Sequence, residues 1–183
     1  WHAGADGQPL HQTTASVQTV IDILQREGKT SFEGEYYNLP YNGDDASGLG
    51  KPLKLIEQPL RSDIPIYLAA IGPKNIELTA EIADGWLPFM YSPTLGDKFF
   101  NQFLEKGFEK SGNPNKKEKF NISAPVFAKV CDESERDAYL APARNNYTLY
   151  VGGRGAKDKN LSFKWMCEFG DEEIATQIQE LYL

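Results

Sequence analysis

The sequence has few of the residues that build metal, disulfide or hydrolytic sites. It contains two cysteines, Cys131 and Cys167, which form no CxxC pair, and only two histidines, His2 and His11. This scarcity argues against a disulfide framework and against a zinc site, and we expect no metal site of any kind. A GxSxG elbow is also lacking. A Ser/His/Asp hydrolase would therefore have to recruit one of the two histidines.

Excess positive charge and long apolar segments are lacking as well. The net charge of −7 and the isoelectric point near 4.9 argue against a nucleic-acid or anionic-membrane partner. No apolar run approaches the roughly 20 residues that span a membrane, and no basic-then-apolar leader opens the chain. With 40% hydrophobic residues the composition is globular. We expect a soluble cytoplasmic protein with reduced thiols.

The first part of the chain has the signals of a helix and a hairpin. Thr13 or Thr14 can cap a helix that Gly28 would end. Its apolar residues follow the i, i+3, i+4, i+7 spacing of one helix face and are Val17, Val20, Ile21 and Leu24. Aromatic residues on both sides of Gly34 predict a short hairpin over residues 30–39, and a loop should follow over residues 41–50.

The middle of the chain repeats a strand-helix pattern. Residues 64–71 are continuously apolar, as in a strand buried on both faces, and residues 74–83 then predict a helix. Shorter apolar and alternating runs predict further strands over residues 86–90 and 120–130, with a helix from Ser92-Pro93 to about residue 110 between them. The core face of that helix should comprise Phe99, Phe103, Leu104 and Phe108. Such units predict parallel strands and an α/β class, but do not separate a barrel from an open sheet.

Helices are predicted to close the chain. Asp132 can cap a helix toward Tyr150, which Pro142 should break or kink. A glycine-rich loop follows, and then two helical stretches, of which the second is capped by Asp171. Its apolar face should hold Ile174, Ile178 and Leu181.

The strongest site signal is the segment 69–75, AAIGPKN, in which a buried strand turns through Gly72 into a helix. A helix N-terminus offers unpaired N–H groups and the positive end of the helix dipole, and glycine lets a phosphate approach the backbone. Lys74 would add a point charge. The segment lies at the carboxyl end of a parallel strand, where α/β proteins place ligands. The same Gly-Pro turn can equally serve structure alone.

Other candidates are less specific. The loop Gly152-Gly153-Arg154-Gly155-Ala156-Lys157 could contact an anionic ligand or be a plain surface loop, and it matches neither nucleotide-binding glycine motif. Trp86 and Phe89 are expected in the core or in a pocket wall. Glu77 and Glu81 are expected on a solvated helix face, not as an acid/base pair.

Several segments, taken in order, resemble the luciferase-like monooxygenase superfamily and, within it, the deazaflavin-dependent oxidoreductases. They cover nearly the whole chain and are SFEGEYYNLP at 31–40, GKPLKLI at 50–56, IPIYLAAIGPKN at 64–75, AEIADGW at 80–86 and YVGGRGA at 150–156. The resemblance implies an eight-stranded α/β barrel whose fifth strand is followed by a loop that holds the cofactor phosphate with backbone amides. Transferred to this sequence, that loop comprises Ile71, Gly72, Pro73, Lys74 and Asn75.

The resemblance also predicts which part of the barrel this is. Trp1-His2-Ala3-Gly4 is similar to the segment after the fourth strand, and both ends of the chain look cut. We therefore expect an α/β fold that is a partial (β/α)8 TIM-type barrel, without the N-terminal strands and the C-terminal closure. Residues 1–183 would form a single incomplete domain, from the exit of strand 4 through the helices after strand 7. No catalytic residue is assigned, because the ring-binding part of such barrels lies on earlier strands.

The activity implied by the resemblance is hydride transfer between a deazaflavin, coenzyme F-420 (8-hydroxy-5-deazaflavin), and a small organic substrate. The protein would supply orientation and electrostatics, and the cofactor the chemistry. The first alternative is an FMN-dependent monooxygenase that uses molecular oxygen. Others are a non-catalytic cofactor-binding module and a barrel for a sugar phosphate or another small ligand. The expected partners are substrate and cofactor, and a homodimer is a further option.

Overall fold

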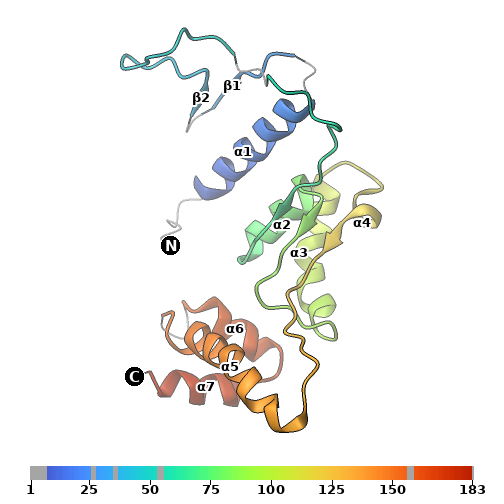
Figure 1. Cartoon of the computed structure of the whole chain (residues 1–183), viewed down its shortest axis with the longest axis vertical. Coiled ribbons are helices and arrows are strands. Elements are labelled where there is room, and N and C mark those ends of the chain that lie inside the picture. Colours follow the sequence, from blue (N-terminus) through green and yellow to red (C-terminus); the bar gives the residue numbers. More distant parts are fainter. Residues whose placement is uncertain (1–7, 26–27, 35–36, 53–55, 156–158, 183) are drawn as a thin grey trace. The chain divides into compact units, whose positions relative to one another are not determined.

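The computed structural model describes residues 8–25, 28–34, 37–52, 56–155 and 159–182 (Figure 1). The chain forms two compact units. The first unit comprises residues 1–87 and 103–123, and the second unit comprises residues 88–102 and 124–183.

The first unit begins with helix α1 (Gln8–Gln25), followed by strands β1 (Phe32–Glu33) and β2 (Asn38–Leu39). The two strands pair antiparallel with Phe32 opposite Leu39, which confirms the predicted hairpin. The helix begins earlier than predicted, and the cap at Thr13 or Thr14 is wrong. Thr14 instead donates its hydroxyl to the Leu10 carbonyl within the helix, at 3.0 Å. Pro9 is compatible with this earlier start, because proline is well tolerated in the first helical turn.

A three-stranded parallel sheet is the centre of the first unit. Its strands β3 (Tyr67–Leu68), β4 (Gly85–Trp86) and β5 (Asn121–Ile122) lie in the order β3-β4-β5. Helix α2 (Pro73–Ile82) connects the first two strands, and helices α3 (Gly96–Lys110) and α4 (Lys116–Lys119) lie between the last two. The predicted order of elements and the parallel pairing are confirmed.

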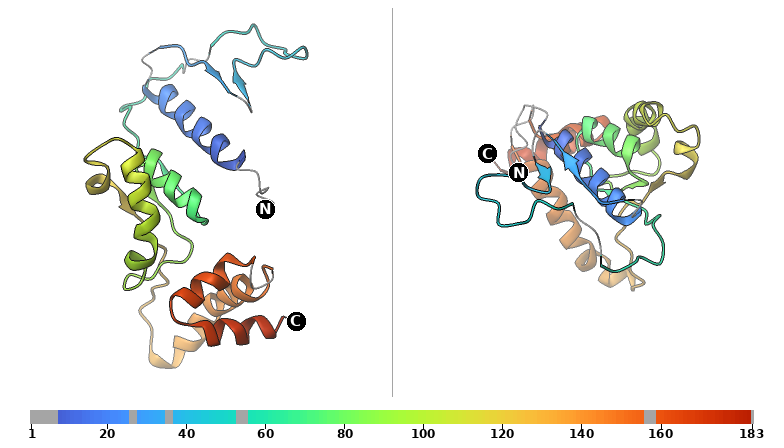
Figure 2. Two further views of the ribbon diagram at one scale, coloured as in Figure 1. Left: turned by 180° about the vertical axis from the view of Figure 1, so that it is seen from behind. Right: turned by 90° about the horizontal axis from the view of Figure 1, so that it is seen from above.

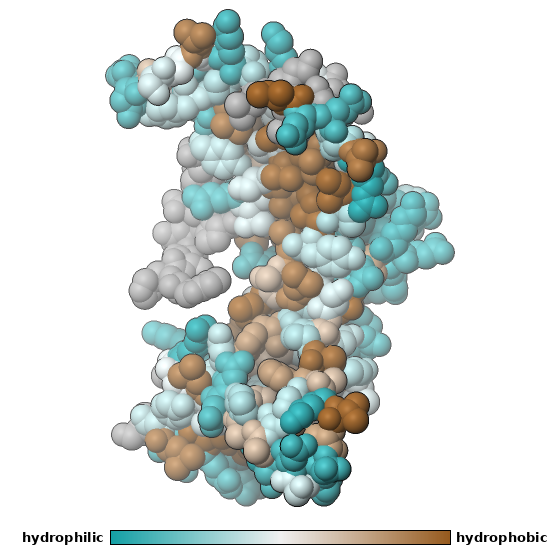
Figure 3. Space-filling model, viewed as in Figure 1, coloured by the Kyte–Doolittle hydropathy of each residue, from teal (hydrophilic) through white to brown (hydrophobic). Residues whose placement is uncertain are grey.

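The strands are shorter and less buried than the sequence predicted. Ile64 is 42% exposed, and Val126 and Val130 are almost wholly exposed, so the alternation beyond Ile122 does not form a strand. Apolar side chains are accordingly visible among polar ones on the surface (Figure 3). In the part of the chain that the structure describes, β3 and β5 each pair with β4 alone. A strand with one neighbour leaves the backbone groups of its other edge unpaired.

Helices α2 and α3 lie side by side in the first unit, and Gly107 of α3 marks their closest approach (Figures 1 and 2). A Cβ atom at Gly107 would be 2.1 Å from the Glu77 carbonyl oxygen and 2.6 Å from the Ala80 Cβ. Ala80 and Ile76 are wholly buried in this contact region of α2, and Leu104 of α3 is 2% exposed. The glycine therefore lets one helix backbone rest on the other.

The second unit is built from helices α5 (Arg136–Gly152), α6 (Leu161–Glu168) and α7 (Glu172–Glu180), which pack together after a short 3-10 turn, η1 (Glu133–Glu135) (Figures 1 and 2). Residues Val151, Phe163 and Ala175 form its core. An aromatic cluster completes it and comprises Phe99, Phe100, Trp165 and Phe169. Phe100 is wholly buried, although the predicted core face of α3 omitted it.

Three local predictions for the second unit are only partly confirmed. Pro142 lies inside α5 without breaking it, because packing against α6 and α7 outweighs one lost backbone bond. The buried face of α7 is formed by Ala175, Ile178 and Gln179, and leaves Ile174 half exposed, since small Ala175 lets the helix approach the core closely. Asp171 precedes α7 but makes no side-chain cap bond.

Asn160 caps helix α6 with its side chain. Its side-chain oxygen accepts from the Phe163 amide, which caps α6, and its amide group donates to the Tyr150 and Val151 carbonyls at the end of α5. One buried side chain thus fixes two helix ends.

Candidate phosphate-binding turn

The turn between β3 and α2 contains all five residues of the predicted phosphate-binding loop. Gly72 is the N-cap of α2, Pro73 opens the helix, and the Ile76 amide closes the first turn on the Gly72 carbonyl at 2.9 Å. The amides of Lys74 and Asn75 precede this first intrahelical bond, and Pro73 has no N–H to offer. Two amides at the positive end of the helix dipole are therefore available to an anion.

Glycine at position 72 is not explained by the backbone or by packing among the described residues. Its φ of −78° and ψ of 154° are extended values that any residue adopts. A Cβ atom there would meet nothing within 4 Å. The space next to the turn is therefore open, and the lack of a side chain leaves the α2 amides accessible. The turn fits a phosphate group that binds close to the backbone.

Trp86 anchors the strand end from which this turn begins. Its indole Nε1 donates a hydrogen bond to the Ala70 carbonyl at 2.8 Å, and the side chain is wholly buried. Trp86 is on β4, directly paired with β3, so the bond ties the residues just before the turn to the middle of the sheet. Of the two predictions for Trp86, core and pocket wall, the core is confirmed.

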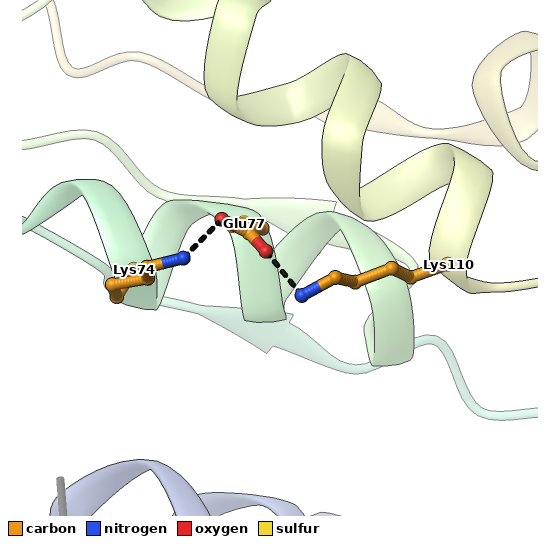
Figure 4. Close-up of polar contacts among 3 residues, drawn as sticks. All are labelled: Lys74, Glu77 and Lys110. Carbon is orange, nitrogen blue, oxygen red and sulfur yellow. Dashed lines mark hydrogen bonds and ion pairs between the residues drawn. The ribbon is translucent and has the colours of Figure 1, made fainter.

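Glu77 is buried between two lysines one turn into α2, and the prediction that it lies on a solvated face is wrong. One carboxylate oxygen accepts from the Lys74 ammonium at 3.1 Å, and the other from the Lys110 ammonium at the end of α3 (Figure 4). The Glu77 side chain is 7% exposed, whereas Lys74 and Lys110 are 75% and 55% exposed. The burial results from the close approach of α3 at Gly107, which a single-helix pattern does not reveal.

The charges in this cluster shift the protonation equilibria of Glu77 and Lys110. The hydrogen bond from Lys110 is the largest influence and lowers the pKa of Glu77, with a smaller contribution from Lys74, although burial acts in the opposite direction. The pKa of Lys110 is raised in turn, mainly by its bond to Glu77 and slightly by the charge of Glu81. The Glu77 carboxylate and the Lys110 ammonium are therefore charged at neutral pH.

This pKa shift predicts how stability depends on pH. A carboxylate whose pKa is lowered by folding stabilises the native state above its unfolded value, near 4.5, and loses that contribution as the pH falls through the folded pKa. We expect the difference in unfolding free energy between wild type and Glu77→Gln to be constant above about pH 5 and to shrink on acidification. Urea unfolding of both proteins at a series of pH values measures this difference in unfolding free energy. A difference that persists unchanged to about pH 3 would contradict the assignment.

The second predicted loop is only partly described. Gly152 is the last residue of α5 and is buried, while the Arg154 guanidinium lies over the Tyr150 ring at 4.0 Å from its centre. Ala156 and Lys157 lie outside the described residues. Phe89, predicted in the core or a pocket wall, is half-buried, and its ring packs on Tyr150 at 4.2 Å between centres.

The structure describes one of the two histidines. His2 lies outside the described residues. His11 is exposed on α1 and lines a hollow of about 310 Å³ against the hairpin, together with Phe32 and Tyr37. In the described ranges, no three His, Cys, Asp or Glu side chains gather in a way that could hold a metal ion. No described helix is both long and apolar enough to cross a membrane.

The comparisons with known proteins agree with the fold and define the family. Residues 1–180 match the family described as luciferase-like monooxygenase, and the chain belongs to this family. A protein of Mycobacterium tuberculosis, provisionally named a coenzyme F420-dependent oxidoreductase, is 37% identical over 182 residues, which are 100% of this chain and 52% of that protein. The resemblance found in the sequence is confirmed.

A solved structure shows the same fold. The coenzyme F420-dependent tetrahydromethanopterin reductase of Methanopyrus kandleri superposes with a TM-score of 0.61 at 19% identity, over 93% of this chain and 47% of its own. This likeness confirms the predicted α/β fold of a partial (β/α)8 TIM-type barrel. The chain spans about half the length of each of these two proteins, given coverages of 52% and 47%.

Proposed function

We propose that the protein is an oxidoreductase that binds a deazaflavin of the coenzyme F420 type and transfers hydride between it and a small organic substrate. Membership of the luciferase-like family and the relative of Mycobacterium tuberculosis support this proposal. The observation that carries it is the open turn at Gly72, which has two free helix amides and the Lys74 side chain next to it. Neither the backbone conformation nor packing among the described residues requires glycine at this position. Residues 1–183 would belong to a single incomplete barrel domain.

In this proposal the cofactor phosphate is held by Ile71, Gly72, Pro73, Lys74 and Asn75. The Lys74 and Asn75 amides would donate to the phosphate oxygens, and the Lys74 ammonium would balance part of their charge. Pro73 fixes the first helical turn, and Ile71 carries the chain from the strand into it. When bound, the deazaflavin supplies two-electron hydride chemistry, and these residues hold and orient it. A cytoplasmic location and a homodimer stay predictions.

Removing the Lys74 ammonium is expected to weaken cofactor binding. We expect Lys74→Ala to raise the dissociation constant for the deazaflavin roughly 5- to 10-fold, which corresponds to about 1 kcal/mol. The loss is modest because the side chain is largely exposed and two backbone amides remain. The measurement is a fluorescence titration of the protein expressed from its complete reading frame.

The matched control is Lys119→Ala, which removes one positive charge from an exposed position on α4. It should bind the deazaflavin like the wild type. A parallel titration with FMN tests the monooxygenase alternative, because FMN presents a phosphate to the same turn. If neither cofactor binds, the proposed function is ruled out. If only FMN binds tightly, the cofactor is a flavin and the monooxygenase alternative is favoured.

A further inference from the structure

Two lysines share one buried carboxylate next to the candidate turn. Lys74 and Glu77 lie three residues apart on α2, while Lys110 reaches Glu77 from α3 (Figure 4). The two ammonium groups lie on opposite sides of the carboxylate and bind different oxygens. Together the three side chains carry one surplus positive charge.

The three members differ in how freely they can move. Glu77 is almost completely buried and cannot follow a departing partner, whereas the Lys74 side chain is 75% exposed and can turn away. Lys110 is placed one turn after Gly107, where the backbones of α2 and α3 touch. Helix packing therefore sets the position of the Lys110 backbone next to Glu77, and the Lys110 side chain is less exposed than that of Lys74, at 55%.

This difference matters when an anion binds at the start of α2. To contact a phosphate, the Lys74 ammonium has to exchange Glu77 for the phosphate oxygens. If Lys74 were the sole partner, this exchange would leave a buried carboxylate without a countercharge, which is strongly unfavourable. Lys110 keeps Glu77 compensated, so the exchange is less costly. Glu81, the other carboxylate that acts on Lys110, lies one turn further from the helix start and is half-exposed.

We propose that Lys110 is a positioning residue for anion binding at the N-terminus of α2. It neutralises Glu77 and thereby releases Lys74 for the cofactor phosphate, although Lys110 itself belongs to a different helix. The inference rests on the proposed function, since it assumes a phosphate at this turn. It assigns a role in binding to a residue that lies 36 positions after Lys74 in the sequence.

A double-mutant cycle on Lys110 and Glu77 tests this role in the protein expressed from its complete reading frame. The dissociation constant for the deazaflavin is measured by fluorescence at fixed ionic strength, because exposed charges are screened by salt. We expect Lys110→Met to bind about 3- to 10-fold more weakly, because Glu77 then retains Lys74. Glu77→Gln should bind at least as tightly as wild type, and adding Lys110→Met to it should cause no further loss.

A purely structural role for Lys110 predicts a different pattern. In that case binding would weaken in step with the melting temperature, and the double variant would bind worse than either single variant. The positioning role instead predicts that the double variant regains affinity without regaining stability. Lys110→Arg, which keeps the cation, should bind like wild type. Additive losses, or unchanged binding in Lys110→Met, would overturn the inference.

The outcomes also separate this inference from the proposed function. If the wild type binds neither the deazaflavin nor FMN, both proposals fail. If the wild type binds the deazaflavin and Lys74→Ala binds it equally well, Lys74 does not contact the phosphate. The role of Lys110 then fails, whereas the cofactor proposal stands. If Lys74→Ala weakens binding and the cycle shows no coupling, only the role of Lys110 is wrong. Should Lys110→Met not fold, the comparison of Glu77→Gln with the double variant remains, since neither leaves a buried uncompensated carboxylate.

Discussion

Replacing Trp86 with alanine should lower the free energy of unfolding by about 3–5 kcal/mol, a large part of the 5–15 kcal/mol typical of a domain. The side chain is wholly buried, so its removal leaves a cavity at the middle strand of the sheet. It also removes the donor that satisfies the Ala70 carbonyl. Urea unfolding followed by circular dichroism measures the loss as a shift of the midpoint.

Trp86→Phe separates the hydrogen bond from the packing. Phenylalanine keeps an aromatic ring in the core but has no N–H, so about 1–3 kcal/mol should be lost. Leu87→Ala is the control on the next residue, because Leu87 is 41% exposed, and it should cost less than about 1 kcal/mol. If Trp86→Phe were as stable as wild type, the bond to Ala70 would not hold the strand end. Weaker cofactor binding by Trp86→Phe would link this bond to the turn.

Gly107→Ala should destabilise the protein, although the same substitution in an ordinary helix interior stabilises by about 0.5–1 kcal/mol. The new methyl group would be 2.1 Å from the Glu77 carbonyl oxygen and 3.0 Å from the Glu81 amide nitrogen. Both are backbone atoms of α2 and cannot rotate away. We expect a loss of about 1–3 kcal/mol from the separation of the two helices.

Gly48→Ala is the matched control, because a methyl group at Gly48 would meet nothing within 4 Å. It should change the unfolding free energy by less than about 0.5 kcal/mol. A stabilised Gly107→Ala variant would show that α2 and α3 do not touch at this point. Because Lys110 follows one turn later on α3, a destabilised Gly107→Ala variant should also have weaker coupling between Lys110 and Glu77 in the double-mutant cycle.

Much of the site could be predicted because its signals are local. A Gly-Pro pair between an apolar run and a helical pattern places Gly72 and Pro73 at a helix start whatever the rest of the chain does. Lys110 was missed, since nothing in the spacing of α3 indicates which helix it faces. A glycine at position 107, inside an otherwise regular helix, was the one available signal of a close approach.

The errors have a common origin in contacts between segments that are distant in sequence. The sequence pattern predicts Glu77 on the solvated face of α2, but the side chain is buried because α3 covers it. The sequence pattern predicts Ile174 and Leu181 on the core face of α7, but they are exposed because Ala175 and Gln179 face the core. In both cases the helix itself was correctly predicted, but the face of the helix that is buried was not.

The sequence by itself determined the α/β class, the order of the helices and strands, the turn at Gly72 and the family, because these depend on local patterns and ordered motifs. The tertiary structure alone decided which faces are buried, how far each strand extends and which lysines Glu77 binds. These features depend on packing, since a buried carboxylate or a strand ladder needs a partner that the neighbouring residues in sequence do not specify.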